Sequence, residues 1–376
     1  MVSVWERNSL LQADHVVIGA GIVGLCTAYY LKQRFPAQRV LVLERGCIPA
    51  GASTRNAGFA CMGSASELLD DLQDRSEEDM LALFLFRKQG LERLRQLLGD
   101  DQIGYQAKGS YELIMPQDLE VLGELPYLNK VISELIGNEP FSIDNESISR
   151  SKFSPTNVLA MIRNHCEAQI DTGMMMRSLK EKVMRSGIEV LGGCIVQSIE
   201  EYPHQVEIIC RQLGAESLFR FVAADVCVCT NAFTLDLIKG LDIVPGRGQV
   251  LLTKPIPNLP FQGIYHFDKG YYYFREYQGA VLFGGGRNKD FETERTSNEG
   301  LNPLIQADLI EKLKEIILPG RDFEIDLQWS GIMAFGATKE PIVLAHSSRI
   351  FLGVRMGGMG IAIGSEVGFR LASLIP

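Results

Sequence analysis

The sequence predicts an α/β fold: a Rossmann-type domain into which a second domain, built on an antiparallel sheet, is inserted. Because the inserted sheet is antiparallel, the chain as a whole is of the α+β type. Three observations favour this class. A strand–glycine-turn–helix–strand unit opens the chain, strand-like segments with short turns dominate from residue 188, and a second strand–glycine-turn–helix closes the chain. With 376 residues, the chain is long enough for two substantial domains.

The opening unit covers residues 14–46. DHVVIGA predicts a short strand, GIVGLCTAYYLKQRF predicts a helix with apolar residues at helical spacing, and RVLVLE predicts a second strand. Pro36 ends the helix and begins the loop back, because proline cannot continue the helical hydrogen bonding. These residues are therefore expected to form one βαβ unit.

Three glycines in GxGxxG spacing, Gly19, Gly21 and Gly24, join the first strand to the helix. The first permits a tight turn, the second lets a pyrophosphate approach the backbone, and the third lets helix and strand pack closely. The helix start presents free N–H groups and a positive dipole end to an anion. The sequence thus predicts a dinucleotide site, whose other members in this turn are Ala20, Ile22 and Val23.

The next strand bears on which dinucleotide is bound. Glu44 ends it, 20 residues beyond Gly24, and its carboxylate suits a ribose 2′-OH but would repel a 2′-phosphate. NADP is therefore disfavoured, although Arg45 beside Glu44 keeps it open, and both residues belong to the predicted site. An NAD-dependent dehydrogenase would normally continue with further βα units. This chain instead returns to a glycine-rich helix start only in its last 27 residues, which suits a longer cofactor.

The segments between these two ends predict a mixture of helices and strands. Residues 67–79, ELLDDLQDRSEED, predict a solvated helical face, and MLALFLFRKQGLERLRQLLG predicts an amphipathic helix ended by Gly99. GSYELIMP predicts a strand and DLEVLGELPYLNKVISELIG a helix. Residues 156–187 predict two helical stretches, the second capped by Asp171 or Thr172. Strands then dominate, with the runs GYYYFREY and FGGGR, until a helix in PLIQADLIEKLKEIIL.

Composition excludes several classes of function. The net charge of −9 argues against a nucleic-acid groove, which needs a basic stripe. The eight cysteines form no CxxC pair and the five histidines no HxxxH spacing, so no metal site is expected. No secretory signal pattern and no apolar run of membrane-spanning length are visible, so a cytoplasmic protein without a membrane span is expected.

Several motifs together resemble one known family. GAGIVG with Glu44, GASTRNAG, CTNAF, YYYFR leading to FGGG, WSG with Pro341, and the closing GMGI are similar to D-amino-acid oxidase, glycine oxidase and sarcosine oxidase. The resemblance covers nearly the whole chain in the correct order. Within the family, YYYFR…FGGG is most similar to the γ-glutamylputrescine oxidases.

The resemblance implies an FAD-dependent oxidoreductase that transfers a hydride from a C–N bond of an amine or amino acid to the flavin, after which the imine hydrolyses. Oxygen or another acceptor would take the electrons. Covalent flavin attachment in this family uses a C-terminal cysteine or a histidine near the first loop. This chain has no cysteine after Cys229 and no histidine in GASTRNAG, so non-covalent FAD is expected.

The resemblance also implies which residues contact FAD. GASTRNAGF would wrap the diphosphate and the flavin face, and the backbone of Val196 would meet the adenine. The residues TNA of CTNAF, at the end of a strand, would lie near the ribose and phosphates. The closing glycine turn would lie near the flavin pyrimidine. The residues implied are Ala52, Ser53, Thr54, Arg55, Asn56, Ala57, Gly58, Phe59, Val196, Thr230, Asn231, Ala232, Gly331, Gly357, Gly358, Met359, Gly360 and Ile361.

The substrate contacts are expected on the strand YYYFRE. On an extended strand Tyr271, Tyr273 and Arg275 share one face, while Tyr272 and Phe274 share the other. By resemblance Tyr271 matches a substrate-contacting tyrosine, and which of the three tyrosines faces the flavin stays open. Arg275 is a candidate substrate contact, and Arg247 and Arg355 are secondary candidates.

Amino-acid-oxidising members of the family carry an arginine that binds the substrate α-carboxylate, and its place here is Met333. A thioether cannot neutralise a carboxylate, so the oxidised carbon is expected to carry none. Any anion is expected farther off, near Arg275 or Arg355. The alternatives are an amino-acid oxidase or dehydrogenase with a relocated arginine, a flavin-binding protein without turnover, and an NAD-dependent dehydrogenase.

The domain organisation follows from these motifs. The FAD-binding domain is expected to be discontinuous, over residues 1–85, 150–232 and 327–376. The substrate domain is expected over residues 86–149 and 233–326, with its antiparallel sheet over the flavin.

Overall fold

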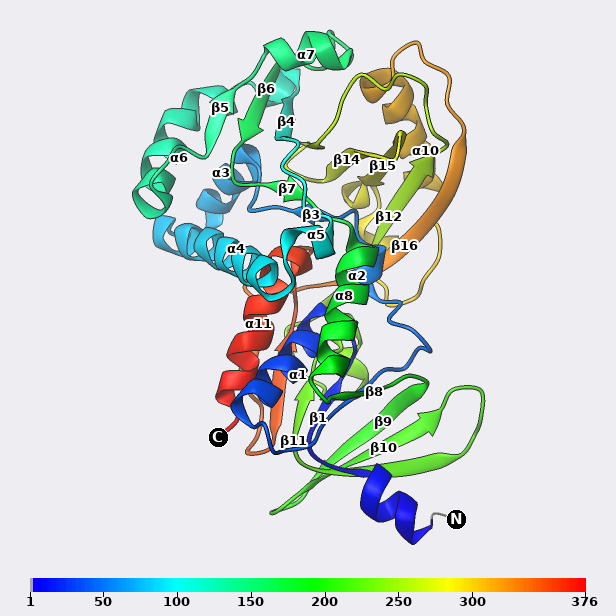
Figure 1. The fold of residues 1–376 in the computed structure, drawn as a ribbon. Coiled ribbons are helices and arrows are strands. Elements are labelled where there is room, and N and C mark those ends of the chain that lie inside the picture. The colour runs from blue at the N-terminus through cyan, green and yellow to red at the C-terminus, as the bar shows by residue number, and fades with distance from the viewer. Residues whose placement is uncertain (1–2) are drawn as a thin grey trace.

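The computed structural model describes residues 3–376, which form two large sheets, one in each half of the molecule (Figure 1). The first sheet has the order β17-β18-β11-β1-β2-β8, and the strands from β18 to β8 are parallel. β10 and β9 extend it from β11 as antiparallel partners. Its strands are β1 (Gln12–Ile18), β2 (Val40–Leu43), β8 (Glu189–Leu191), β9 (Cys194–Glu201), β10 (Val206–Gln212), β11 (Leu218–Val228), β17 (Ile342–Ala345) and β18 (Ile350–Val354).

Alternating side chains of β1 serve two different cores. Val17 packs with α1 (Ile22–Arg34), α8 (Thr172–Arg185) and α11 (Gly360–Leu374), which cover one face of the sheet. Val16 and Ile18 point to the opposite face, where residues of β10, β11 and β18 pack against them. Both faces of the parallel strands are therefore covered, which explains the continuous apolar runs of their sequences. The predicted Rossmann-type half of the α/β fold is confirmed.

The second sheet has the order β16-β12-β15-β14-β13-β4-β6-β5 and is antiparallel except for the pair β4–β13. Tyr272 and Phe274 are buried on its outer face beneath α10 (Pro303–Lys312) and η5 (Leu313–Ile317), while Tyr273 and Arg275 lie on the inner face. The predicted alternation along this strand is confirmed. The strands are β4 (Ser110–Ile114), β5 (Phe141–Ile143), β6 (Ala160–Asn164), β12 (Val244–Thr253), β13 (Ile264–Phe267), β14 (Tyr272–Tyr277), β15 (Ala280–Gly285) and β16 (Ile325–Phe335).

The prediction of two helices in residues 156–187 is wrong for the first of them. Residues 160–164 form β6 between β4 and β5, and Ala168–Gln169 form β7, which pairs with β3 (Phe59–Ala60). Pairing on both sides of β6 overrides the helical periodicity of this apolar run. The second helix, α8, is confirmed, and the side chain of Asp171 caps it by accepting a hydrogen bond from Met174 N–H.

The sheet membership shows where the expected domain boundaries fall. The boundaries at 150 and 327 cut through the second sheet, because β6 and β16 both pair within it. The boundary at 86 falls inside α4 (Glu77–Leu98), which packs closely on α11. A Cβ on Gly90 of α4 would lie 2.1 Å from the carbonyl oxygen of Ala362.

The remaining helical elements are short except for α3 and α6. None of the helices in residues 3–376 is both long and apolar enough to span a bilayer. These elements are η1 (Glu6–Leu10), α2 (Ala52–Arg55), α3 (Ala65–Asp74), α5 (Asp100–Ile103), η2 (Pro116–Asp118), α6 (Val121–Ile136), α7 (Glu146–Ser151), η3 (Asn231–Asp236), η4 (Arg287–Lys289) and α9 (Phe291–Glu294).

Candidate functional site

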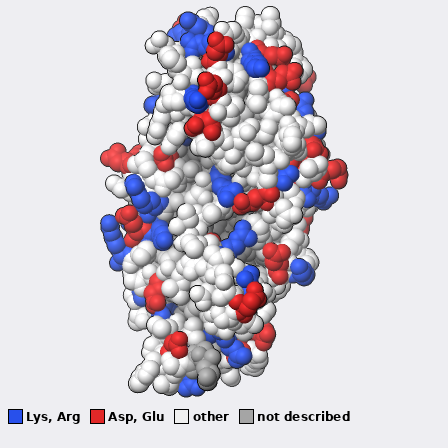
Figure 2. Space-filling view, turned by 90° about the vertical axis from the view of Figure 1, so that its right-hand side faces the viewer, with Lys and Arg blue, Asp and Glu red and all other residues white. Residues whose placement is uncertain are grey.

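A cavity of about 1160 Å³ extends from the carboxyl ends of β1 and β2 to the inner face of the second sheet. The surface is hollowed near mid-height of the molecule, where basic and acidic side chains gather (Figure 2). The cavity is larger than the roughly 300–1,000 Å³ typical of small-molecule sites. It therefore has room for an extended cofactor together with a substrate.

The glycine turn between β1 and α1 forms one end of the cavity. Gly19 has φ +103°, a conformation that side chains disfavour, and a Cβ on Gly24 would lie 1.9 Å from the Gly19 carbonyl oxygen. A Cβ on Gly21 would lie 3.0 Å from Oγ of Ser53, and that Oγ accepts a hydrogen bond from Ile22 N–H at 3.0 Å. Ser53 thus ties the loop of residues 51–59 to the anion-binding end of α1.

Glu44 lies at the end of β2 and lines the same end of the cavity. Its two carboxylate oxygens accept hydrogen bonds from Ala20 N–H at 2.9 Å and Gly46 N–H at 3.0 Å. Each oxygen retains a lone pair for a ribose hydroxyl. The guanidinium of Arg45 stacks 3.7 Å above the ring of Phe233, and both residues line the cavity.

The loop of residues 51–59 forms the middle wall. The Arg55 guanidinium donates to the carbonyl of Ser330 at 3.0 Å and pairs with Glu299 at 3.0 Å. Thr54 turns away from the cavity, because its hydroxyl donates to the carbonyl of Gly51 at 3.1 Å. Asn56 accepts a hydrogen bond from Gly58 N–H at 2.9 Å, which fixes the sharp turn at Gly58.

Most of the site residues predicted from the sequence line this one cavity. Those that do are Gly19, Gly21, Ile22, Val23, Glu44, Arg45, Ala52, Ser53, Arg55, Asn56, Ala57, Phe59, Val196, Thr230, Asn231, Tyr271, Gly331, Met333, Gly357, Gly358, Met359, Gly360 and Ile361. Ala20, Gly24, Thr54, Gly58, Ala232, Arg275 and Arg355 do not line it. Ala20 and Gly24 support the glycine turn from behind.

Two arginines expected near the substrate are engaged elsewhere, which corrects the expectation for an anion site. Arg275 is 5% exposed and donates from Nη1 to the carbonyls of Ala57, Gly58 and Ile170. Arg355 forms an ion pair with Asp242 and donates to nearby oxygens of the chain. Both guanidinium groups lie outside the cavity lining, since their partners are protein oxygens.

The inner face of the second sheet forms the far wall, with Tyr271 and Tyr273 facing the cavity. Tyr272 lies on the outer face and donates its hydroxyl to Asp308 at 2.7 Å. A Cβ on Gly284 would lie 2.7 Å from the Tyr273 hydroxyl, so this glycine leaves space for the tyrosine ring. Burial raises the pKa of Tyr273 to about 12, which keeps its phenol neutral.

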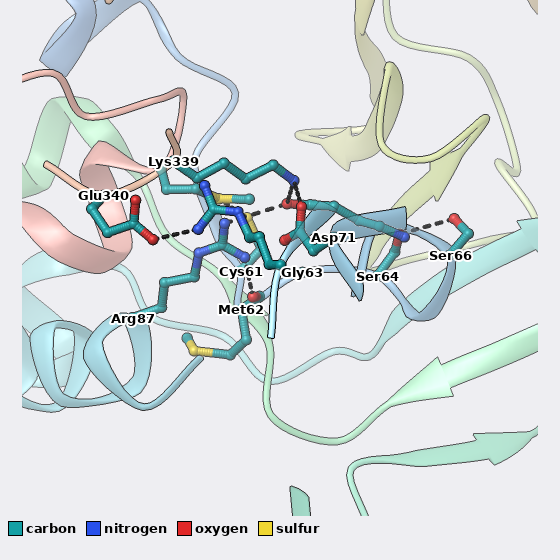
Figure 3. Close-up of polar contacts among 12 residues, drawn as sticks. Cys61, Met62, Gly63, Ser64, Ser66, Asp71, Arg87, Lys339 and Glu340 are labelled. Atoms are coloured by element: carbon teal, nitrogen blue, oxygen red, sulfur yellow. Dashed lines mark hydrogen bonds and ion pairs between the residues drawn. The ribbon is translucent and has the colours of Figure 1, made fainter. Parts of the chain in front are cut away.

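Four carboxylates of α3 line the cavity, which corrects the expectation of a solvated helical face: Glu67, Asp70, Asp71 and Asp74. They stand at i, i+3 and i, i+4 spacing, a signal in the sequence for one shared face. Lys339 reaches Glu67 at 3.2 Å and Asp71 at 2.5 Å. The close-up shows the Lys339 side chain extending to the Asp71 carboxylate (Figure 3). Burial would raise the pKa of Glu67, but Arg87 and Lys339 outweigh it and hold that pKa below its usual value.

His266 also lines the cavity, beside Phe59, and nothing in its short apolar strand distinguishes it in the sequence. Burial would lower its pKa, but the buried carboxylate of Glu167, 3.6 Å away, outweighs this and raises it. Glu167 also accepts hydrogen bonds from the N–H groups of Met62 and Gly63. His266 is therefore held toward its charged form at the substrate end.

The residues at the nucleotide end fit FAD. The glycine turn leaves space that a Cβ would fill, the start of α1 directs its N–H groups into the cavity, and Glu44 keeps acceptor capacity. The closing turn, residues 357–361, lines the cavity at the start of α11 and offers a second set of N–H groups.

A family model described as FAD dependent oxidoreductase matches residues 14–374. No curated protein matches the chain. Among solved structures, L-proline dehydrogenase from P. horikoshii has a TM-score of 0.77 at 18% identity, covering 97% of this chain and 93% of its own. Glycine oxidase from Geobacillus kaustophilus has a TM-score of 0.75 at 19% identity, covering 97% and 94%. L-α-glycerophosphate oxidase from Mycoplasma pneumoniae, solved with FAD bound, has a TM-score of 0.73 at 16% identity, covering 97% and 94%.

Proposed function

Because the chain belongs to the family of FAD-dependent oxidoreductases, we propose that it oxidises the C–N bond of an amine. Bound FAD supplies the hydride acceptor for such a reaction. In this proposal the glycine turn and the start of α1 hold the diphosphate, Glu44 holds the ribose, and Asn56 lies beside the flavin ring with residues 357–361. The second sheet orients the amine and excludes water.

The acidic face of α3 is the observation that carries the choice of an amine. Lys339 pairs with Glu67 and Asp71, and Lys269 pairs with Asp70 at 2.5 Å. Among residues 3–376, Asp74 has no ion-pair partner and Oδ2 of Asp71 has no hydrogen-bond partner. Arg87 also pairs with Glu67, so Asp74 is the one carboxylate of this face left without a counter-ion among residues 3–376, and it favours the entry of an ammonium over that of a neutral alcohol.

An alcohol is the competing class, because the similar structures include a glycerophosphate oxidase as well as a glycine oxidase and a proline dehydrogenase. Alcohol oxidation needs a base to remove the hydroxyl proton. His266 lines the cavity, but Glu167 holds it toward its charged form, which is a poor base. An ammonium also has to lose a proton, but its pKa is close to the value of about 10.4 for a lysine side chain, so water can take that proton without a protein base. The neutral amine can then lose a hydride from its carbon, and the structure favours this class of substrate.

The test is anaerobic mixing of the FAD-loaded protein with matched pairs that differ only in nitrogen or oxygen. Pentylamine and 5-aminopentanoate are expected to bleach the flavin, whereas 1-pentanol and 5-hydroxypentanoate are not. Hydrolysis of the imine product should release ammonia in the amount of flavin reduced. Bleaching by the hydroxyl compounds would contradict the proposal, and bleaching by neither class would identify a flavin-binding protein without turnover.

The finer resemblance, to γ-glutamylputrescine oxidases, supports a proposal about the shape of the substrate. Met333 lines the cavity in the place of the family's carboxylate-binding arginine, and Arg275 and Arg355 are both occupied. We therefore infer an amine with an extended tail and no carboxylate on the oxidised carbon. An α-amino acid held by a relocated arginine is the alternative.

A further inference from the structure

Arg287 is a cation in the cavity that no expectation from the sequence included. It follows β15 after one intervening residue, Gly286, in the run FGGGR, and begins η4. Its guanidinium stacks on the ring of Phe335 at 3.9 Å and lies 4.8 Å from the ring centre of Phe291. The ring of Tyr271 packs edge-on against Phe291 and extends the aromatic surface beside the cation.

Within residues 3–376, the Arg287 guanidinium has neither an ion-pair partner nor a hydrogen-bond acceptor, unlike Arg55 and Arg75 in the same lining. The carboxylate of Glu294 contributes to its electrostatic environment but is itself bound by Arg247, Gln249 and Asn302. Burial lowers the pKa of Arg287, yet a guanidinium stays charged in proteins. A partly desolvated cation without a counter-ion is unfavourable, and a ligand anion would relieve this.

The position of Arg287 relates directly to the missing arginine at Met333. Gly246 of β12 is the cross-strand partner of Met333 on β16. A Cβ on Gly246 would lie 3.1 Å from Nη1 of Arg287 and 2.5 Å from the Phe335 ring. The guanidinium therefore occupies the space above Gly246, one strand across from Met333. A larger residue in place of Gly246 would fill that space.

The surroundings of the two positions differ in chemistry. Met333 is half-buried, and its sulfur would lie 3.7 Å from a Cβ on Gly358 of the closing turn. Arg287 is also half-buried, and its neighbours Phe291 and Tyr271 are 43% and 37% exposed. The cation thus lies among partly exposed aromatic side chains, while the side chain next to the closing turn is apolar.

We propose that Arg287 binds a carboxylate on the tail of the amine, so that the substrate class is an elongated amine with a distal carboxylate. This inference rests on the proposed function, and it names the substrate class of the same site. The neighbouring aromatic side chains orient the guanidinium, which can then accept a carboxylate through two parallel N–H···O bonds. The apolar surface at Met333 accommodates the chain between the two ends.

The experiment separates binding from turnover by using pentanoate, which has the carboxylate but no amine to oxidise. Its dissociation constant is measured from the change it causes in the absorbance of the bound flavin. Arg287→Met should weaken pentanoate binding by about tenfold or more, and Arg287→Lys by less. Lys289→Met, which removes an exposed cation two residues away, is the matched control and should bind pentanoate like the wild type.

A second readout compares flavin reduction by 5-aminopentanoate and by pentylamine. The wild type should favour the carboxylate-bearing amine, and Arg287→Met should lose that preference while still oxidising pentylamine. If Arg287→Met does not fold, the same two readouts on Arg287→Lys decide. A wild type that does not bind pentanoate, or an Arg287 variant that matches it in both readouts, would overturn the assignment. Failure of both pentylamine and 5-aminopentanoate to reduce the wild-type flavin would instead count against the proposed function.

Discussion

Replacing Gly24 by alanine is expected to weaken FAD binding strongly. The added Cβ would lie 1.9 Å from the carbonyl oxygen of Gly19, and the neighbouring obstacle is backbone that cannot rotate away. Helix α1 must then move off β1, which deforms the turn that the cofactor's phosphates need. Overpacking of this kind costs about 1–3 kcal/mol, so FAD affinity should fall by about 100-fold at the upper end.

Titration of the apoprotein with FAD, followed by flavin fluorescence, measures this loss. Gly123→Ala in α6 is the matched control, because a Cβ there meets no atom within 4 Å. Alanine is also the better helix former, so the control should bind FAD normally and unfold at an equal or higher temperature. Wild-type affinity in Gly24→Ala would show that the close approach of β1 and α1 is not needed for binding.

Arg275→Met is expected to lower the free energy of unfolding and to loosen the cofactor loop. Its guanidinium is the donor for three carbonyls, of Ala57, Gly58 and Ile170, which join the loop of residues 51–59 to the segment before α8. The Gly58 carbonyl keeps the N–H of Ile170 as a donor, whereas the carbonyls of Ala57 and Ile170 would lose theirs, at a cost of about 1–3 kcal/mol each. Removal of a buried cation offsets part of this, so a net loss of about 2–3 kcal/mol is expected.

Denaturant unfolding of the apoprotein and FAD release on heating the holoprotein measure the two effects. Arg163→Met is the control, since Arg163 is an exposed arginine on β6 of the same sheet. Arg275→Lys keeps one donor group and should recover part of the stability. Full stability of Arg275→Met with altered kinetics toward amines would instead restore the earlier expectation that Arg275 contacts the substrate.

The nucleotide half of the site could be predicted because its signals are local. Gly19, Gly21 and Gly24 lie within six residues, and Gly19 and Gly24 each have a steric requirement that only glycine meets. Glu44 follows at the spacing that a βαβ unit imposes. The faces of residues 271–275 were predictable for the same reason, since strand alternation depends only on neighbours along the chain.

The substrate half could not be predicted in the same way, because its members come from segments far apart in the sequence. Nothing in the sequence around Arg275 distinguishes it from any other arginine on a strand. The carbonyl groups that it binds lie more than a hundred residues earlier in the chain. The neighbours of Arg287 in the sequence do not indicate that it lacks a counter-ion. Its surroundings become apparent only in the fold, which places Phe335 and Gly246 beside it. The acidic residues of α3 are predicted to be solvated because the sequence does not show that Lys339 lies opposite them in the fold.

The most direct test of the account is the rate at which different amines reduce the bound flavin in anaerobic stopped flow. The FAD-loaded wild type is mixed separately with 5-aminopentanoate, glycine, sarcosine, D-alanine and D-proline at equal concentrations. The account predicts rapid bleaching by 5-aminopentanoate alone, because Met333 offers no partner to a carboxylate on the oxidised carbon. Rapid bleaching by any of the four α-amino acids would contradict it.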